Sequence, residues 1–414
     1  MNAAGLLWPE PLLQLNPSFE PGATIEQLVE EGVLHEECGR VFRIKQHDTD
    51  FGKPLRLHFH QEQAIRTAAA DHSYVLTTGT GSGKSLSYII PAVDYVLRGG
   101  SGRGIQAIVV YPMNALANSQ REELNKFLQR GYGENEQPVT VARYTGQERD
   151  EERERILRNP PDILLTNYVM LELILTRIDD PSLVNQAVEL PFLVLDELHT
   201  YRGRQGADVS MLIRRCREAF GSEHMRCVGT SATMASVGTS EDQARVVAEV
   251  ATKIFGEEVS DQHVIGETLR RTTVEYDFST TENKDALRTA ITSEGEPDED
   301  FRTFRADRLA SWIESTFGLR REEETGKLIR CTPRSLSGDE GAAKDLADLA
   351  GADQEKAEAA IERYLYAGSA VEQPDTGFPV FAFRLHQFIS RGDTVWSSLE
   401  DEESRYITLR GQQF

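Results

Sequence analysis

The chain has 414 residues, of which 39% are hydrophobic and 27% charged, and a formal net charge of −22. This composition is typical of a globular protein with two or three hydrophobic cores. No apolar run approaches the roughly 20 residues that cross a bilayer, so we expect a cytoplasmic protein without a membrane partner. The acidic balance argues against a protein that coats nucleic acid through bulk positive charge. The four cysteines are widely spaced and include no CxxC pair, which argues against a disulfide framework and a cysteine zinc site.

The first 54 residues are mixed in character. Prolines come early, and a short amphipathic stretch follows at residues 24–34. No basic segment precedes an apolar one, so this region does not resemble a secretory signal. We interpret residues 1–54 as an N-terminal extension that packs on the first domain.

From residue 55 onward, short apolar runs alternate with helical patterns. Buried strands separated by helices predict an α/β fold, with a parallel sheet covered by helices on both faces. Ligands bind at the carboxyl ends of the strands in such sheets. We assign this domain to residues 55–275. The expected strands are 74–77, 107–111, 139–144, 163–166, 192–195 and 226–229, and the expected helices are 60–70, 85–97, 115–129, 148–157, 169–176, 207–220 and 240–255.

Residues 74–85, YVLTTGTGSGKS, combine an apolar run, a glycine-rich turn and the start of a helical segment. This order is typical of a P-loop, in which glycines let backbone N–H groups approach a polyphosphate closely. Lys84 would reach the β- and γ-phosphates, and the Ser85 hydroxyl would ligate Mg²⁺. The strict pattern asks for glycine where this chain has Thr78. The residues expected to hold ATP are Thr78, Gly79, Thr80, Gly81, Ser82, Gly83, Lys84 and Ser85.

Asp196 and Glu197 directly follow PFLVL, an expected buried strand. Two carboxylates at the carboxyl end of a strand, facing a P-loop, are what Mg²⁺-dependent phosphoryl transfer needs. Asp196 would hold Mg²⁺ through water, and Glu197 would orient or deprotonate the attacking water. The alternative is an ordinary acid pair in a loop at a helix start.

His199 completes DELH, one substitution from DEAH, and residues 231–233 form SAT. Together with the P-loop, these motifs resemble the DExH class of superfamily 2 helicases in order and spacing, over about residues 55–236. The resemblance implies a RecA-like domain that binds ATP and Mg²⁺, with His199 in the catalytic set. It also implies that Ser231 and Thr233 couple hydrolysis to motion.

Other family motifs can be placed residue by residue. Gln61, in HFHQEQA, matches the glutamine that hydrogen-bonds the adenine edge in the family; the alternative is an exposed polar residue at a helix start. Thr78 matches the Ala or Thr that the family often carries in its P-loop. The family contacts strand phosphates through hydroxyls and backbone N–H groups, which suits an acidic chain. The matching residues are Asn114, Ala115, Thr145, Gly146, Thr166 and Asn167.

A narrower resemblance rests on DELHTYRGRQGADVSMLIRRCRE and FRLHQFISRGDTVWSSLE. Both are similar to segments of the large bacterial helicases with a cysteine-rich C-terminal region. That group includes DNA-repair helicases and phage-defence helicases of the DISARM and Druantia kind. The resemblance implies DNA as the nucleic acid and defence-complex subunits as partners. Five arginines there line either a nucleic-acid groove or a solvated helix face: Arg202, Arg204, Arg214, Arg215 and Arg217.

The character of the chain changes after the first domain. We predict a smaller, mostly helical accessory domain over residues 276–370 and the start of a β-containing segment over residues 371–414. Within the accessory domain, residues 278–307 are polar and acidic and fit a solvated linker or a loose helix. The expected short amphipathic helices are 309–317, 342–349 and 354–365, and KLIRC is an expected strand.

Residues 237–414 contain no second P-loop-like pattern and no QxxGRxxR-like motif. A working helicase needs a second RecA-like domain that supplies an arginine across the nucleotide. We therefore expect this chain to be the N-terminal part of a longer protein or complex. The second domain would come from a missing C-terminal part or a partner chain, and the chain by itself would hydrolyse ATP poorly.

The predicted function is ATP-dependent unwinding of, or translocation on, nucleic acid. Two alternatives stay open: a restriction-type translocase that moves on duplex DNA without separating the strands, and a nucleotide-gated scaffold that binds nucleic acid without turnover. The intact Glu197 argues against the scaffold. A P-loop kinase or GTPase is disfavoured by the SAT motif and by the lack of an NKxD-like guanine reader.

Overall fold

The structure is a computed structural model that forms two compact units. The larger unit is Phe19–Thr268, and the smaller unit combines Met1–Ser18 with Leu269–Phe414. The chain therefore passes between the units twice. The division into four domains made from the sequence stays a prediction. The residues described are 11–47, 50–79, 81–132, 136–176, 181–187, 189–201, 203–231, 238–293 and 295–387, with the backbone of 396–397 and 407–408.

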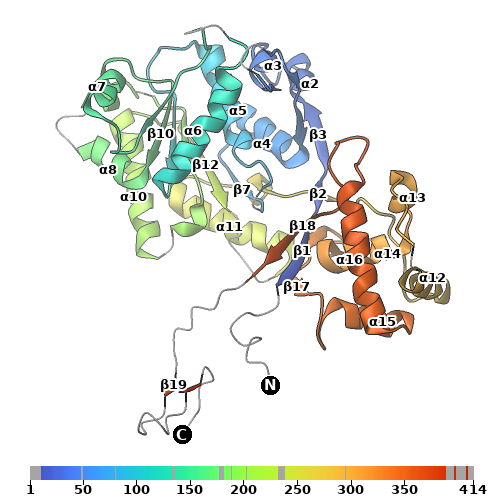
Figure 1. Cartoon of the computed structure of the whole chain (residues 1–414). Coiled ribbons are helices and arrows are strands. Elements are labelled where there is room, and N and C mark those ends of the chain that lie inside the picture. Colours follow the sequence, from blue (N-terminus) through green and yellow to red (C-terminus); the bar gives the residue numbers. More distant parts are fainter. Residues whose placement is uncertain are drawn as a thin grey trace. The chain divides into compact units, whose positions relative to one another are not determined.

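The larger unit is built on a seven-stranded sheet in which every pair of neighbours is parallel (Figure 1). This confirms the predicted RecA-like α/β fold. Six strands match the expected ones to within two residues at either end. The seventh, β13, was missed because only three residues, VIG, separate charged and polar segments. In sheet order the strands are β13 (Val264–Gly266), β7 (Tyr74–Thr77), β12 (Arg226–Ser231), β11 (Phe192–Leu195), β8 (Ala107–Tyr111), β10 (Ile163–Asn167) and β9 (Val141–Tyr144).

Helices cover both faces of this sheet (Figure 1). Successive side chains of a strand point to opposite faces, so Tyr74 and Leu76 join one core and Val75 joins the other. Helices α4 (Phe59–Ala69), α5 (Leu86–Gly99) and α6 (Asn114–Leu128) pack on the first face. The second face carries α7 (Asp150–Arg158), α8 (Tyr168–Thr176), α9 (Pro181–Asn185), α10 (Arg204–Phe220) and α11 (Ser240–Phe255).

The chain first passes into the larger unit at Phe19, and the residues that follow pack on that unit. Strand β3 (Pro21–Thr24) pairs with β6 (Arg56–His58). A capping box between Thr24 and Gln27 then starts α2 (Ile25–Glu30), whose Ile25 joins the core under α4 and α5. The remaining short elements of this unit are α3 (Cys38–Val41), β4 (Arg43–Ile44), β5 (Lys53–Pro54), η1 (Leu198–Thr200) and η2 (Asp261–His263).

Strand β1 (Leu12–Asn16) belongs to the smaller unit, so the interpretation of residues 1–54 as an extension packed on the first domain is wrong for this strand. Strand β1 lies between β17 (Arg334–Ser335) and β18 (Ala382–His386), antiparallel to both. Alternate side chains of β1, Leu13 and Leu15, are buried in the core of this unit. The alternation that places one face of β1 in a core did not indicate which core it joins.

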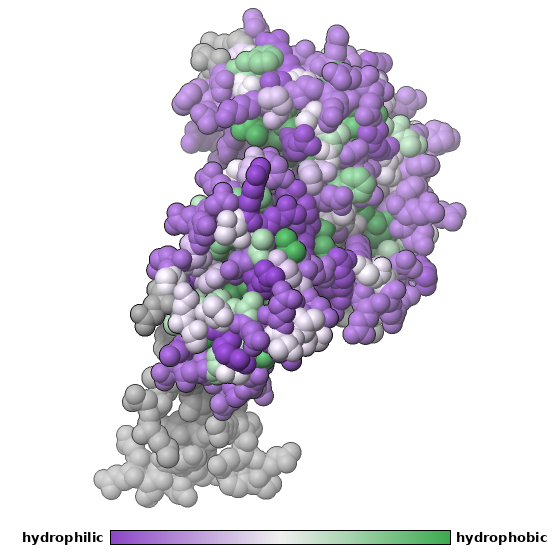
Figure 2. All heavy atoms as spheres, turned by 90° about the vertical axis from the view of Figure 1, so that its right-hand side faces the viewer, coloured by the Kyte–Doolittle hydropathy of each residue, from purple (hydrophilic) through white to green (hydrophobic). Residues whose placement is uncertain are grey.

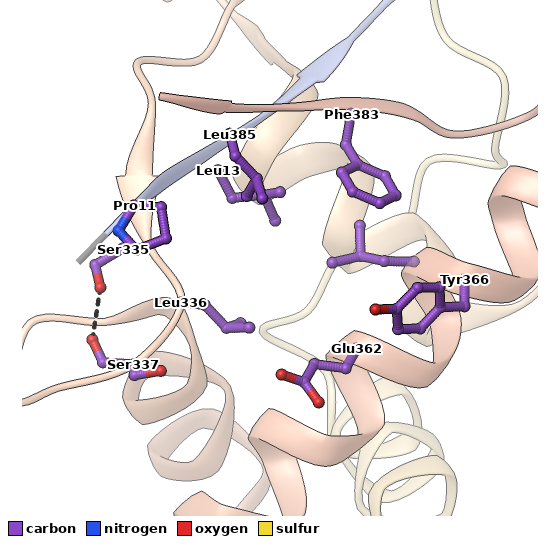
Figure 3. Close-up of a pocket in the computed structure, with 10 residues that line it drawn as sticks. Pro11, Leu13, Ser335, Leu336, Ser337, Glu362, Tyr366, Phe383 and Leu385 are labelled. Atoms are coloured by element: carbon purple, nitrogen blue, oxygen red, sulfur yellow. Dashed lines mark hydrogen bonds between the residues drawn. The ribbon is translucent and has the colours of Figure 1, made fainter. Parts of the chain in front are cut away.

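The smaller unit is mostly helical, as predicted. Helices form even in the polar stretch 278–307, because Leu287, Ile291 and Phe304 supply buried anchors. An apolar pocket of about 340 Å³ lies between the strands and α16, with Phe383 and Tyr366 on its wall (Figure 3). The elements are β2 (Ser18–Phe19), which begins in this unit, β14 (Leu269–Arg270), α12 (Thr281–Thr292), α13 (Phe301–Arg305), α14 (Arg308–Ile313), η3 (Glu314–Gly318), β15 (Leu319–Arg321), β16 (Leu328–Arg330), α15 (Ala342–Ala350), α16 (Gln354–Ala370), β19 (Trp396–Ser397) and β20 (Ile407–Thr408).

The face shown in Figure 2 is largely hydrophilic, in keeping with the net charge of −22. Apolar side chains show on it mainly as scattered patches, which is ordinary for a folded protein. In the part of the chain that the structure describes, no helix combines the length and the apolar character needed to cross a membrane.

Candidate functional site

The predicted P-loop connects β7 to α5 at the carboxyl edge of the sheet. Gly81 and Gly83 have φ of 86° and 70°, a left-handed conformation that favours glycine. A Cβ on Gly83 would lie 2.5 Å from Nε2 of Gln61, so a side chain has no room there. The two glycines thus let the loop turn into the start of α5, and a helix N-terminus favours bound phosphate. Thr80 lies outside the described residues.

Thr78, which departs from the strict P-loop pattern, is fully buried, and its hydroxyl contacts another residue of the loop. Its hydroxyl lies 2.7 Å from the Ser82 hydroxyl, across the base of the loop. Ser82 is held a second time, because Nε2 of buried His60 lies 2.9 Å from the Ser82 carbonyl oxygen. Burial lowers the pKa of His60 to about 4, so the ring is neutral at neutral pH and Nε2 is its donor.

Gln61 is nearly fully buried and ties α4 to the P-loop. Its Nε2 donates to the Gly83 carbonyl oxygen at 2.8 Å, and its Oε1 accepts the His58 N–H at 2.8 Å. The alternative of an exposed polar residue at a helix start is therefore wrong. The oxygen and the nitrogen of the Gln61 side-chain amide thus each have a hydrogen-bond partner within the protein. The predicted contact of Gln61 with adenine stays a prediction.

The acid pair lies next to the P-loop lysine. Nζ of Lys84 is 3.3 Å from Oε1 of Glu197, and both side chains are largely shielded from solvent. Glu197 has φ of 53°, an uncommon left-handed conformation for a residue with a side chain. Such backbone strain occurs at sites where a side chain is held in one direction. The sequence prediction that Asp196 and Glu197 face the P-loop agrees with this contact, and their catalytic roles stay predictions.

Thr230 is a site residue that the sequence interpretation missed. Its hydroxyl donates to Oδ1 of Asp196 at 2.5 Å and accepts the backbone N–H of Glu197 at 3.1 Å. One side chain on β12 thus holds the carboxylate of Asp196 and the backbone of Glu197, the two residues that follow β11. Its position directly before SAT was the only available signal.

His199 and Ser231 are brought together as predicted. Nδ1 of His199 lies 3.3 Å from the Ser231 hydroxyl and 3.2 Å from Oε2 of Glu197. The third member of the expected set, Thr233, lies outside the described residues. A chain of polar contacts therefore runs from Lys84 through Glu197 and His199 to Ser231, and its role in coupling stays a prediction.

The residues around the acid pair fit a magnesium ion. Oε2 of Glu197 is buried and accepts no hydrogen bond from the described residues. The carboxylate of Asp196 and the hydroxyl of Ser85 are oxygen donors, the kind that Mg²⁺ prefers. Burial raises the pKa of Asp196, so a cation beside it would stabilise its ionised form.

Predicted nucleic-acid contacts gather where β8, β9 and β10 end. Nδ2 of Asn167 donates to Oδ1 of Asn114 at 2.6 Å and to the Thr145 carbonyl oxygen at 3.2 Å. Ala115 is exposed in the first turn of α6. Next to these, Met113 and Val169 are 61% and 60% exposed.

The donors of this cluster are occupied within the protein. Glu148 accepts the backbone N–H groups of Thr145 and Gly146 at 2.9 and 2.8 Å, and also the Thr145 hydroxyl. Thr166 is fully buried, and its hydroxyl donates to the Tyr144 carbonyl oxygen. The predicted contacts of Thr145, Gly146 and Thr166 with a nucleic-acid strand stay predictions. The Thr166 hydroxyl is not at the surface.

Two of the arginines of α10 are held by carboxylates of the protein. Nη2 of Arg215 bonds both carboxylate oxygens of Glu172, and Arg217 pairs with Glu257 at 3.1 Å. These two are ion-paired to the protein itself. Arg202 lies outside the described residues.

Residues 59–240 match the family model described as DEAD/DEAH box helicase. Druantia protein DruE of Escherichia coli (strain UMEA 4076-1) is 26% identical over 347 residues, covering 56% of this chain and 18% of that protein. The uncharacterized ATP-dependent helicase YprA of Bacillus subtilis (strain 168) is 31% identical over 185 residues, covering 44% of this chain and 23% of that protein. ATP-dependent helicase hrq1 of Schizosaccharomyces pombe is 33% identical over 179 residues, covering 42% of this chain and 16% of that protein.

The chain thus spans about a fifth of the length of these relatives. Among solved structures, the DUF1998 helicase MrfA bound to DNA is 21% identical, with a TM-score of 0.46, and the match covers 70% of this chain and 40% of that one.

Proposed function

Since residues 59–240 match the DEAD/DEAH box helicase family model, we propose that the chain is the ATP-binding part of an ATP-dependent nucleic-acid helicase or translocase. The observation that carries the proposal is the contact of Lys84 with Glu197 beside the glycine-rich turn of the P-loop. A general-purpose phosphate site needs the loop alone, whereas hydrolysis also needs a carboxylate near the terminal phosphate.

Bound ATP with Mg²⁺ would supply the phosphoanhydride that is cleaved. Lys84 would leave Glu197 for the β- and γ-phosphates, because a triphosphate offers more negative charge than one carboxylate. Ser85 and Asp196 would hold Mg²⁺, Asp196 through water and oriented by Thr230. The freed Glu197 would then orient or deprotonate the attacking water.

We propose that nucleic acid binds across the ends of β8, β9 and β10. The amides of Asn114 and Asn167 suit phosphate and sugar oxygens, and the exposed Met113 and Val169 suit the apolar faces of unstacked bases. DNA is our proposed substrate, in a repair or antiviral defence system, since the relatives include Druantia protein DruE. Defence-complex subunits as partners and a cytoplasmic location belong to the same proposal.

A second RecA-like domain completes the proposal. Phosphoryl transfer in this class needs a cation from across the nucleotide, and among the described residues one seven-stranded sheet of this kind is present. We therefore propose that a longer polypeptide or a partner chain contributes the second half, and that residues 1–414 alone hydrolyse ATP slowly.

The direct test is nucleotide binding to this chain, measured with a fluorescent ATP analogue and Mg²⁺. We expect Lys84→Ala to weaken binding at least about 100-fold, since it removes the cation that meets the phosphates. The matched control is Lys253→Ala, an exposed lysine on α11 of the same unit, which should bind like wild type. Equal affinity of both variants and wild type would contradict the P-loop assignment.

Strand separation and translocation need separate assays on the complete protein. Displacement of a labelled strand supports a helicase. Displacement of a third strand from a triplex, without duplex opening, supports the duplex translocase instead. ATP binding with neither activity, and without hydrolysis in the presence of DNA, supports the nucleotide-gated scaffold.

A further inference from the structure

Both crossings between the units start next to the P-loop. The chain leaves the larger unit after Thr268, at the end of a short segment that follows β13. It enters that unit at Phe19. Backbone hydrogen bonding joins the two places, because the Glu20 N–H donates to the Thr268 carbonyl oxygen at 2.9 Å. Movement of one crossing therefore disturbs the other.

Glu267 connects the second crossing to the P-loop. Oε2 of this half-buried carboxylate accepts the backbone N–H of Gly79 at 3.2 Å. The preceding strand is held as well, since the Thr77 hydroxyl lies 3.5 Å from the Ile265 carbonyl oxygen. A carboxylate thus occupies an N–H of the loop that is expected to receive phosphates.

Phe19 connects the first crossing to the same loop through His60. The Phe19 and His60 rings contact edge to face, with centroids 5.3 Å apart. His60 in turn holds the Ser82 carbonyl oxygen. Each crossing therefore contacts a different part of the P-loop, one at Gly79 and the other at Ser82.

The second crossing is anchored again soon after it enters the smaller unit. Glu314, buried in η3, accepts the backbone N–H groups of Thr272 and Thr273, each at 2.8 Å. The Arg271 side chain also donates to the Ser311 carbonyl oxygen at 2.8 Å. Two carboxylates, Glu267 and Glu314, thus hold the segment 268–271 at its two ends.

We propose that Glu267 couples nucleotide occupancy of the P-loop to the crossing segment 268–271, and through it to the smaller unit. This inference rests on the proposed ATP site. The Gly79 N–H has one hydrogen to donate, and the phosphates of ATP repel a nearby carboxylate. Nucleotide binding therefore weakens the bond between Glu267 and Gly79 and releases the segment. Glu267 is a positioning residue in this scheme, since it acts through the loop.

Two readouts on the whole chain test the coupling: affinity for ATP, and amide hydrogen exchange in peptides covering residues 18–22 and 266–273. In wild type, ATP should speed exchange in both peptides. In Glu267→Ala, exchange should be fast without ATP and change little when ATP is added. ATP should also bind about threefold to tenfold more tightly, because a repelling charge is gone.

Glu267→Gln separates charge from contact. Its side-chain oxygen still accepts the Gly79 N–H, so exchange without ATP should stay near wild type. The loss of charge should still tighten ATP binding and reduce the ATP-induced change. The matched control is Glu258→Gln, an exposed glutamate of the same unit, which should behave as wild type in both readouts. If Glu267→Ala does not fold, as judged by circular dichroism, Glu267→Gln alone decides.

The experiments distinguish a failure of the proposed ATP site from a failure of the coupling by Glu267. If wild type binds no ATP, the proposed function and the coupling fall together. If wild type binds ATP but exchange in the two peptides does not respond, the ATP site stands and the coupling is wrong. A wild-type response that survives in both Glu267 variants also overturns the assignment to Glu267.

Discussion

Two polar clusters lie at the carboxyl edge of the sheet. The nucleotide cluster contains Lys84 and Glu197, and the strand-end cluster contains Thr145, Gly146 and Glu148. They differ in how many of their polar groups already have hydrogen-bond partners. At the nucleotide cluster, buried Oε2 of Glu197 has no hydrogen bond from the described residues and lies 3.2 Å from Nδ1 of His199, and Lys84 has one carboxylate contact that a phosphate can replace. At the strand-end cluster, Glu148 already accepts the N–H groups of Thr145 and Gly146. Unsatisfied buried groups cost free energy until a ligand meets them. The first cluster is therefore prepared for its ligand, whereas the second must give up internal bonds first.

The largest expected effect tests whether the strained acid is the reacting group. Glu197→Gln keeps the size of the side chain but cannot accept a proton, so ATP hydrolysis by the complete protein should fall about 1,000-fold or ~4 kcal/mol. ATP binding should remain within a few-fold of wild type. Hydrolysis would be followed as phosphate release with nucleic acid present, and exposed Asp208→Asn on α10 is the control. If Glu197→Gln hydrolyses ATP at the wild-type rate, Glu197 is not the group that activates the attacking water.

Acidic pH should destabilise the folded protein, because His60, which holds the P-loop at Ser82, is buried in its neutral form. Burial lowers its pKa in the folded protein to about 4, from an ordinary 6.5. The unfolded chain therefore binds the proton more readily between these values, and stability falls as pH drops through 6.5, by up to about 3 kcal/mol near pH 4. Urea unfolding at several pH values should show a smaller acid loss in His60→Gln than in wild type. The exposed His224→Gln should retain the wild-type loss.

Thr230→Val measures how much the acid pair depends on its support. The change keeps the shape of the side chain but removes the hydroxyl that bonds Asp196 and the Glu197 N–H. We expect hydrolysis to fall about tenfold, or ~1.4 kcal/mol, because the Asp196 carboxylate loses its donor and the Glu197 N–H loses its acceptor. Affinity for the ATP analogue without Mg²⁺ should change little. A comparable loss of that affinity would mean that Thr230 supports the loop instead of the acids.

The smallest effect concerns the strand-end cluster. Glu148→Gln weakens the bonds to Thr145 and Gly146, so nucleic-acid affinity should rise about threefold while ATP affinity stays constant. Fluorescence anisotropy with a labelled DNA strand measures this, and exposed Glu151→Gln on α7 controls for the change in net charge. Equal tightening in both variants would point to bulk charge, and weaker binding would mean that Glu148 holds the turn in its binding shape.

Much of the larger unit could be predicted because its signals are local. Buried strands carry β-branched runs, and the P-loop and the acid pair are contiguous in sequence. Thr230 and Glu267 could not be predicted, since each is a single polar residue whose role depends on a partner that only the fold brings near. Likewise, the alternation in β1 predicts a half-buried strand, but its partners lie more than 300 residues away.

That last pairing also sets an order of assembly. Translation proceeds from the N-terminus, so β1 is made before Phe19–Thr268, whereas its partner β18 is complete only when residue 386 has been added. The larger unit, Phe19–Thr268, is complete well before then and contains its own cores. We therefore expect the larger unit to fold while β1 still exposes an unpaired edge, so that β1 pairs with β18 only after the larger unit is complete.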